Sequence, residues 1–172
     1  MSIYRWKEDF MHYIWGLDLS LSSTGIAIYD LETNSFAHIT SIDTTDIRDV
    51  KANKGKYLNG LKLFKIQEEM RALKEQYPPQ AVVIERGFTR FNTATQVLYR
   101  VHGIANVMFH DIAQIYYAPK DIKATIISGD ASKDMVRQQI LKEIPNLNFK
   151  NEDESDAAAI VLTYLKKNQL NT

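Results

Sequence analysis

The sequence predicts an α/β fold in which three antiparallel strands, followed by parallel strands, form one mixed sheet flanked by helices. Near the N-terminal end, three short runs rich in β-branched and aromatic residues follow one another, and their short connections favour antiparallel pairing. Farther along, apolar strand-like runs alternate with segments of helical period. The length of 172 residues fits a single domain, 1–172, in which residues 1–12 form an N-terminal extension.

The first three strands are expected at Tyr13–Ser20, Thr24–Asp30 and Phe36–Ile42. Turn-forming residues separate them, with Ser22-Ser23 before the second strand and Glu32-Thr33-Asn34 before the third. Such short turns leave no room for a crossover, so the three strands are predicted to pair as a meander.

The rest of the chain is predicted to alternate helix and strand. A polar stretch, Thr44–Lys56, is expected to be a mobile loop. Apolar residues then recur three and four positions apart over Tyr57–Tyr77, which predicts a helix, and Pro78-Pro79 ends it. The same reasoning predicts a strand at Ala81–Glu85, a helix at Asn92–His110, a strand at Gln114–Tyr117, short helices at Lys120–Ile127 and Ser132–Glu143, and a last helix at Asn151–Lys167.

The composition restricts both the setting and the chemistry. There are no cysteines, which excludes disulfides, zinc–thiolate sites and thiol catalysis and fits a reducing compartment. No apolar run approaches the roughly 20 residues needed to span a membrane, and the N-terminal residues lack the apolar core of a signal peptide. We therefore expect a cytoplasmic protein with no membrane association.

The net charge is zero, with 21 basic and 21 acidic residues, but the charge is unevenly distributed. Residues 48–74 contain eight Lys or Arg and three acidic residues, and residues 86–142 contain eight and four, so the remainder is strongly acidic. An acidic site flanked by basic segments is the arrangement that a metal-dependent nuclease requires. Solvated helix faces would explain the basic segments equally well.

Four carboxylates stand where apolar segments begin or end. Asp18 and Glu85 end strands, whereas Asp153 and Asp156 open the last helix and share one helix face because they are three residues apart. A buried carboxylate is unfavourable unless another group compensates its charge, so these acids suggest a shared cation. Carboxylate oxygens suit Mg²⁺ or Mn²⁺, and a carboxylate-only site for these ions indicates phosphoryl-transfer chemistry.

Each acid also has an ordinary explanation. Asp18 could cap the turn of a hairpin, and Glu85 could face solvent or pair with Arg86. Acidic residues also commonly cap helix N-termini. Capping needs only one acid, however, whereas residues 152–156 contain four, which repel one another unless a cation is present.

Two further segments carry candidate nucleic-acid-binding residues. Lys133 lies near a predicted helix start, where the helix dipole disfavours a cation, so it is expected to reach a phosphate. Arg86, Phe88 and Arg90 place guanidinium groups and a ring just after an acid, which suits stacking on an unpaired base. Phe88 could instead belong to the core. The four histidines have no ligand-like spacing and are assigned no role.

Taken in order, these segments resemble the RuvC family of Holliday-junction resolvases, which belongs to the ribonuclease H-like nuclease superfamily. The resemblance extends from about Tyr13 to Leu165. Asp18, after Gly-Leu, looks like the family's first catalytic acid, and Glu85 looks like the second. The pair Asp153 and Asp156, at the start of an Ala-rich helix, looks like the third and fourth. The resemblance implies that these four acids hold two Mg²⁺ ions per active site, with Mn²⁺ able to substitute.

The resemblance also assigns roles to non-acidic residues. Phe88 matches the family's aromatic wedge at the junction, and Lys123 and Lys133 match two lysine positions that contact DNA near the scissile phosphate. The implied protein is a homodimeric endonuclease that cuts four-way DNA junctions by paired phosphodiester hydrolysis and uses no nucleotide cofactor. The family's bacterial Pro-Gly after the first acid is Leu19-Ser20 here, which looks more like the phage-encoded branch and implies the host cytoplasm.

Other functions also remain open at this point. A nuclease of the same fold could act on forks, flaps or structured RNA instead of four-way junctions. ATP-binding proteins of the actin and sugar-kinase group also begin with a Gly-x-Asp strand, but they need a second Gly-rich phosphate loop, and no glycine of this chain lies in a GxG pattern. Non-catalytic binding of branched DNA would not require four acids.

Overall fold

The computed structural model describes residues 12–49, 51–87 and 92–170, and the predicted mixed sheet is present in it. Five strands pair in the order β3-β2-β1-β4-β5. The β1–β2 and β2–β3 pairs are antiparallel, whereas the β1–β4 and β4–β5 pairs are parallel. The strands are β1 (Tyr13–Asp18), β2 (Ser23–Asp30), β3 (Ser35–Asp43), β4 (Pro79–Glu85) and β5 (Ala113–Tyr117).

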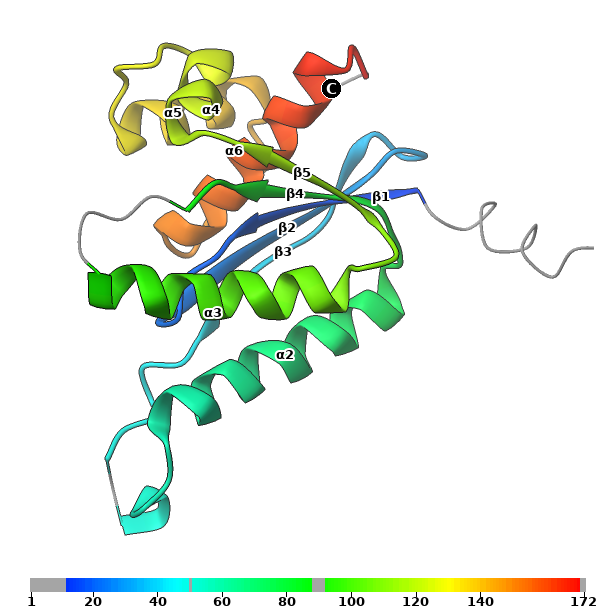
Figure 1. The fold of residues 1–172 in the computed structure, drawn as a ribbon. Coiled ribbons are helices and arrows are strands. Elements are labelled where there is room, and N and C mark those ends of the chain that lie inside the picture. The colour runs from blue at the N-terminus through cyan, green and yellow to red at the C-terminus, as the bar shows by residue number, and fades with distance from the viewer. Residues whose placement is uncertain (1–11, 50, 88–91, 171–172) are drawn as a thin grey trace, which may run out of the picture.

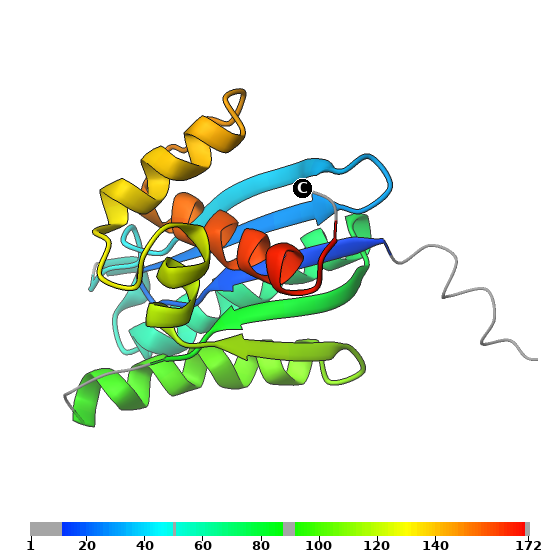
Figure 2. The same ribbon diagram turned by 90° about the horizontal axis from the view of Figure 1, so that it is seen from above.

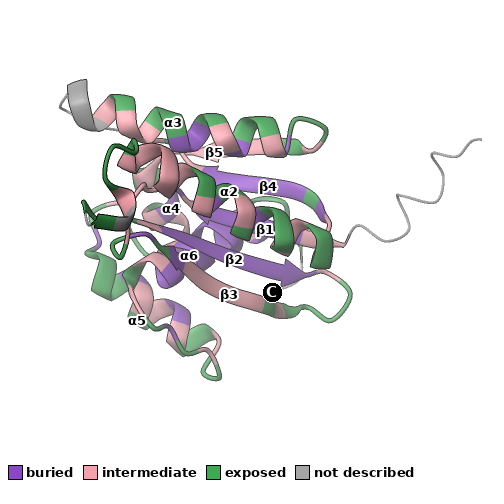
Figure 3. Ribbon diagram, turned by 90° about the horizontal axis from the view of Figure 1, so that it is seen from below, coloured by how far each residue is buried: buried purple, intermediate pink, exposed green. Residues whose placement is uncertain are grey.

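Helices cover both faces of this sheet (Figure 1, Figure 2). On one face lie α2 (Leu58–Gln76) and α3 (Asn92–Met108), and on the other lie α4 (Pro119–Ile126), α5 (Lys133–Glu143) and α6 (Glu152–Lys167). The central strands β1, β2 and β4 are buried between the layers, whereas the edge strand β3 is only partly covered (Figure 3). None of the helices that the structure describes combines the length and apolar character that crossing a membrane requires.

The predicted boundaries differ from the observed ones in three informative places. The first strand ends at Asp18 instead of Ser20, because the Ser20 hydroxyl accepts hydrogen bonds from the backbone of the following turn. The strand predicted to begin at residue 81 begins at Pro79, which a strand tolerates as its first residue. The predicted loop over residues 44–56 contains a short 3-10 helix, Lys51–Asn53.

Two helix starts have the side-chain caps that Ser and Asn commonly provide. Ser132 precedes α5, and its hydroxyl accepts a hydrogen bond from Met135 N at 3.2 Å. Asn151 precedes α6, and its side-chain oxygen accepts one from Glu154 N at 3.0 Å. The sequence predicts both residues as the first of their helices, whereas the structure places each one directly before its helix as the N-cap.

Alternation along the central strands decides which side chains face α6. Ile14 of β1 belongs to the core under α4, α5 and α6, so Gly16 and Asp18 share that face. Val83 of β4 belongs to the same core, which places Glu85 on this face as well. The two strand-end acids therefore point toward the layer that contains the last helix.

Two glycines allow α6 to lie directly on the sheet. A Cβ atom on Gly16 would lie 2.4 Å from the carbonyl oxygen of Ala157, and one on Gly25 would lie 2.1 Å from that of Asp153. Non-bonded heavy atoms prefer about 3.5 Å or more, so no larger side chain fits at either position. The first turns of α6 thus rest on the backbone of β1 and β2.

We expect Gly25→Ala to destabilise the fold by about 1–3 kcal/mol, because its methyl group can be accommodated only by displacing the α6 backbone. Urea unfolding followed by circular dichroism would measure the change. The matched control is Gly103→Ala on the exposed side of α3, where an added Cβ meets no atom within 4 Å. That control is expected to gain about 0.5–1 kcal/mol of stability. Equal unfolding free energies for the two variants would contradict the close contact.

Candidate active site

One edge of the sheet brings together the carboxyl ends of two neighbouring strands. Asp18 is the last residue of β1 and Glu85 the last of β4, and the residues before them, Leu17 and Ile84, are partners in the parallel register. The N-terminus of α6 lies over the same edge, because Gly25, the strand partner of Asp18, is in contact with the backbone of Asp153. The structure therefore brings together acids that are far apart in the sequence.

Burial and mutual repulsion control the ionisation of Asp18. Its pKa is raised to about 7, first by burial and then by the negative charges of Glu85 and Asp156. Asp153 adds a smaller effect in the same direction, and the ammonium group of Lys133 opposes it. Without a bound cation, Asp18 thus changes its charge close to neutral pH.

The ionisation of Glu85 depends on burial and on some of the same charged groups. Burial raises its pKa, and the nearby carboxylate of Asp156 raises it further, while Lys133 and Lys123 act in the opposite direction. Both strand-end acids therefore interact electrostatically with Asp156 of α6. Asp153 acts on Asp18 but not on Glu85, so the four carboxylates are linked through Asp18 and Asp156, and a shared positive charge would stabilise them.

Lys133, the first residue of α5, supplies a positive charge at this edge. Its ammonium nitrogen Nζ lies 2.5 Å from Oδ2 of Asp156 and donates a hydrogen bond to it. Burial alone would lower the pKa of Lys133, but the hydrogen bond and charge of Asp156, followed by the charges of Asp18 and Glu152, raise it overall. Lys133 is consequently held as a cation beside the acids.

A hollow of about 170 Å³ opens beside these charged groups. Glu85, Asp156, Lys123 and Lys133 provide its polar lining. Its apolar walls are Pro119, Ile122, Val136 and Ala159. The hollow is partly open to solvent, and its charged groups of both signs suit an anion accompanied by a cation.

Ser23 is a contact residue that the sequence analysis did not single out. Its hydroxyl donates a 2.5 Å hydrogen bond to Oδ2 of Asp153. The neighbouring Glu154 takes a different role, since it is buried and its Oε2 accepts a hydrogen bond from Lys150 N at 2.7 Å. Glu154 therefore closes the turn before α6, whereas Asp153 is directed toward β2. The sequence offers one indication of this contact, which is that Ser23 directly precedes Thr24 and Gly25 at the start of β2.

The ordinary explanations for the acids do not account for their positions. Asp18 does not cap the turn after β1, where Ser20 and Thr24 supply the side-chain hydrogen bonds. Asp153 and Asp156 do not cap α6, because Asn151 does. Capping therefore does not explain why Asp18, Asp153 and Asp156 occupy these positions.

The candidate nucleic-acid-binding residues that the structure describes lie in different surroundings. Lys123 lines the hollow beside Glu85. Arg86 is exposed, and its backbone N–H donates a hydrogen bond to Tyr117 O at the end of the neighbouring strand. Phe88 and Arg90 lie outside the described residues.

The donor set fits a hard divalent cation. The side chains predicted to bind it are carboxylates, whose oxygens are the ligands that Mg²⁺ and Mn²⁺ prefer. Burial, followed by repulsion among the acids, raises the pKa of both Asp18 and Glu85, and a bound cation would favour their ionised forms. The arrangement can therefore hold metal ions next to a lysine and a hollow of suitable size for a phosphate.

Comparison with known proteins gives a family for this chain. The family model described as "Crossover junction endodeoxyribonuclease RuvC" matches residues 14–164. A protein of that name from Prochlorococcus marinus subsp. pastoris is 28% identical over 165 residues, which are 92% of this chain and 99% of the relative. Another of that name, from Gluconobacter oxydans, is 23% identical over 155 residues, 88% of each chain.

Solved structures share the fold. Thermus thermophilus RuvC has a TM-score of 0.73 with this chain at 18% identity, over 93% of this chain and 97% of that one. The same TM-score, at 17% identity, is found for T. thermophilus RuvC in complex with Holliday junction substrate. The matched residues 14–164 include all of β1 except Tyr13, the other four strands of the sheet, α4, α5, the start of α6 and all four acids. The chain belongs to the RuvC family of crossover junction endodeoxyribonucleases.

Proposed function

We propose that this protein is a Mg²⁺-dependent endonuclease that resolves four-way DNA junctions by paired hydrolysis of phosphodiester bonds. The observation that carries the proposal is the group of four carboxylates at one sheet edge next to a lysine cation, where burial and then the neighbouring negative charges raise the pKa of Asp18 to about 7. The names of its relatives, crossover junction endodeoxyribonucleases, support the substrate.

Asp18, Glu85, Asp153 and Asp156 would hold the metal. We assign the site to Mg²⁺, with Mn²⁺ as a substitute and two ions per site, because carboxylate-only ligation suits these ions. When bound, such ions activate the attacking water and stabilise the leaving oxygen in phosphodiester hydrolysis. The chain contributes the orientation of the ligands, since Ser23 donates to Asp153 and Lys133 donates to Asp156.

Lys133 and Lys123 would serve the phosphate. Both line the hollow next to Glu85, and Lys133 already lies in hydrogen-bond contact with the acid cluster. A fixed ammonium group stabilises the negative charge that grows on a phosphate during hydrolysis. Lys123, farther along α4, is suited to bind the phosphate before and after that step.

Basic segments lead away from the same edge of the sheet. Asp43, the end of β3, pairs with Ser23, so the loop after it starts beside the acids. That loop and α2 contain most of the basic residues between positions 48 and 74. We infer that these segments bind the DNA backbone on both sides of the cut, where phosphate contacts give affinity without sequence preference.

The finer features of the proposal rest on the family resemblance. A two-fold homodimer would match the two-fold symmetry of a junction and give two cuts. Phe88 would stack on a base exposed at the junction centre. Leu19-Ser20 after the first acid supports an origin in the phage-encoded branch, and the lack of cysteine supports a cytoplasmic location.

We expect Asp18→Asn, Glu85→Gln and Asp156→Asn each to abolish cleavage of a synthetic four-way junction, because each removes a charged metal ligand. Junction binding in EDTA should be retained, since Lys and Arg provide the phosphate contacts. Cleavage assays beside matched duplex, fork, flap and structured RNA substrates would test both the chemistry and the substrate.

Glu152→Gln is the matched control for the acid variants. Glu152 is exposed in the first turn of α6, beside Asp153 in sequence, but is not a proposed ligand. This control should cleave at close to the unmodified rate. Cleavage by Asp18→Asn at a comparable rate would rule out the metal site, whereas preferential cutting of flaps or RNA would change only the substrate.

Lys133→Met is expected to slow the single-turnover cleavage rate by about 10²–10³-fold at saturating DNA, because a fixed charge near the phosphate is lost. Lys123→Met should mainly weaken junction binding. The control is Lys142→Met, an exposed lysine near the other end of α5. If the Lys133 and Lys142 variants have equal rates, Lys133 is not part of the active site.

The pKa of Asp18 predicts how stability depends on pH without metal. Its folded-state pKa of about 7 exceeds the roughly 3.9 of an unfolded Asp, so the folded protein binds a proton that the unfolded chain releases between these values. The unfolding free energy in EDTA should therefore fall as pH rises from about 4 to about 7. Asp18→Asn should lack this component and exceed the unmodified protein in stability at pH 8.

Urea unfolding of both proteins in EDTA, at several pH values from 4.5 to 8, would measure the difference. We expect it to grow with pH to on the order of a few kcal/mol, and Mg²⁺ to reduce it at pH 8 by binding the unmodified protein. If the unfolding free energies of the two proteins changed with pH in parallel across this range, the pKa of Asp18 would not be raised in the folded protein.

A further inference from the structure

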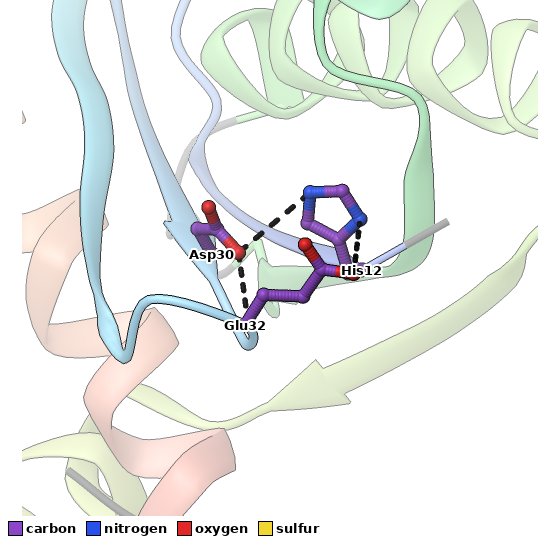
Figure 4. A group of neighbouring side chains, drawn as sticks. All are labelled: His12, Asp30 and Glu32. Carbon is purple, nitrogen blue, oxygen red and sulfur yellow. Dashed lines mark hydrogen bonds and ion pairs between the residues drawn. The ribbon is translucent and has the colours of Figure 1, made fainter. Parts of the chain in front are cut away.

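A second group of potential metal ligands lies at the opposite end of β1. In the part of the chain that the structure describes, His12, Asp30 and Glu32 are the group of His and acidic residues whose ligand atoms all lie within 4.8 Å of one another (Figure 4). Asp18 is five residues along the strand from Tyr13, which corresponds to roughly 17 Å. The group is therefore separate from the carboxylates proposed for catalysis.

The backbone around this group is held by strand pairing. Tyr13 pairs with Asp30, and Leu31 N donates to His12 O at 3.0 Å, so His12 lies beside the end of β2. Oδ1 of Asp30 accepts hydrogen bonds from Glu32 N at 2.8 Å and Thr33 N at 3.4 Å. The three side chains thus start from fixed backbone positions at the turn between β2 and β3.

One ring nitrogen of His12 is buried without a hydrogen-bond partner, although the side chain as a whole is 23% exposed. Nδ1 is inaccessible to solvent and has no hydrogen-bond partner. It lies 3.7 Å from Oε1 of Glu32, while Nε2 lies 3.7 Å from Oδ1 of Asp30. Both distances exceed those of hydrogen bonds, and an unsatisfied buried nitrogen is unfavourable. A bound cation would satisfy this nitrogen and the two carboxylates together.

We propose that His12, Asp30 and Glu32 bind one divalent transition-metal ion of the Zn²⁺ class. An imidazole nitrogen and two carboxylate oxygens are ligands that Zn²⁺ accepts, and a water molecule would complete four-coordination. Small shifts of the His12 and Glu32 side chains would bring the ligand atoms to coordination distance, since these atoms already lie within 4.8 Å of one another. The ion would connect the segment before β1 to the β2–β3 turn. This inference does not depend on the proposed nuclease activity.

Zn²⁺ binding can be measured in full-length protein carrying Asp18→Asn and Asp156→Asn, which removes two acids of the other cluster. Zn²⁺ at about 100 times its dissociation constant is expected to raise the melting temperature of this protein by roughly 5–10 °C. Isothermal titration should give one Zn²⁺ per chain. Adding His12→Gln or Glu32→Gln should weaken binding at least tenfold and remove most of the rise in melting temperature.

His110→Gln in the same background controls for casual binding of Zn²⁺ to surface histidines, because His110 is exposed at the end of α3. It should leave the Zn²⁺ response unchanged. A Zn²⁺ response that persists in both His12→Gln and Glu32→Gln would overturn the proposal. So would the absence of any response in the parent protein, which would show that the three side chains lie together without binding an ion.

Discussion

The direct contact between α6 and the backbone of β1 and β2 determines where the proposed active site of this protein lies. Gly16 and Gly25 remove the side chains that would otherwise separate helix and sheet, and the carbonyl oxygens of Ala157 and Asp153 occupy that space. A helix packed at the usual distance would hold its first turn well above the strand ends. Because it lies on the backbone, Asp153 and Asp156 reach the edge where β1 and β4 end.

This close placement has an electrostatic consequence. Four carboxylates in one half-buried place oppose one another, and the fold retains them although the pKa of Asp18 and Glu85 is raised. Lys133 compensates only in part, since it is a single cation that is hydrogen-bonded to one of the four. An additional positive charge would therefore stabilise the group. Groups whose environment is unfavourable in the isolated protein are commonly those with a functional role.

Capping groups and functional groups are separated at this edge. Ser20 closes the turn after β1, Asn151 begins α6, and Glu154 binds the backbone of Lys150. These contacts satisfy the local backbone without using the acids assigned to the metal. At the other end of the sheet, Asp30 combines the two kinds of role, because its Oδ1 accepts hydrogen bonds from the turn backbone and also lies beside His12.

The sequence by itself determined the order and type of the strands and helices, because hydrophobic period and turn residues are local properties of the chain. It also indicated the four acids, since a charged residue at the end of an apolar run is recognisable without a structure. The tertiary structure alone decided that Ser23 contacts Asp153, that Glu154 turns inward, and that His12 meets Asp30. These pairings depend on strand register and on the approach that Gly16 and Gly25 allow, and both arise from packing between segments that are distant in the sequence.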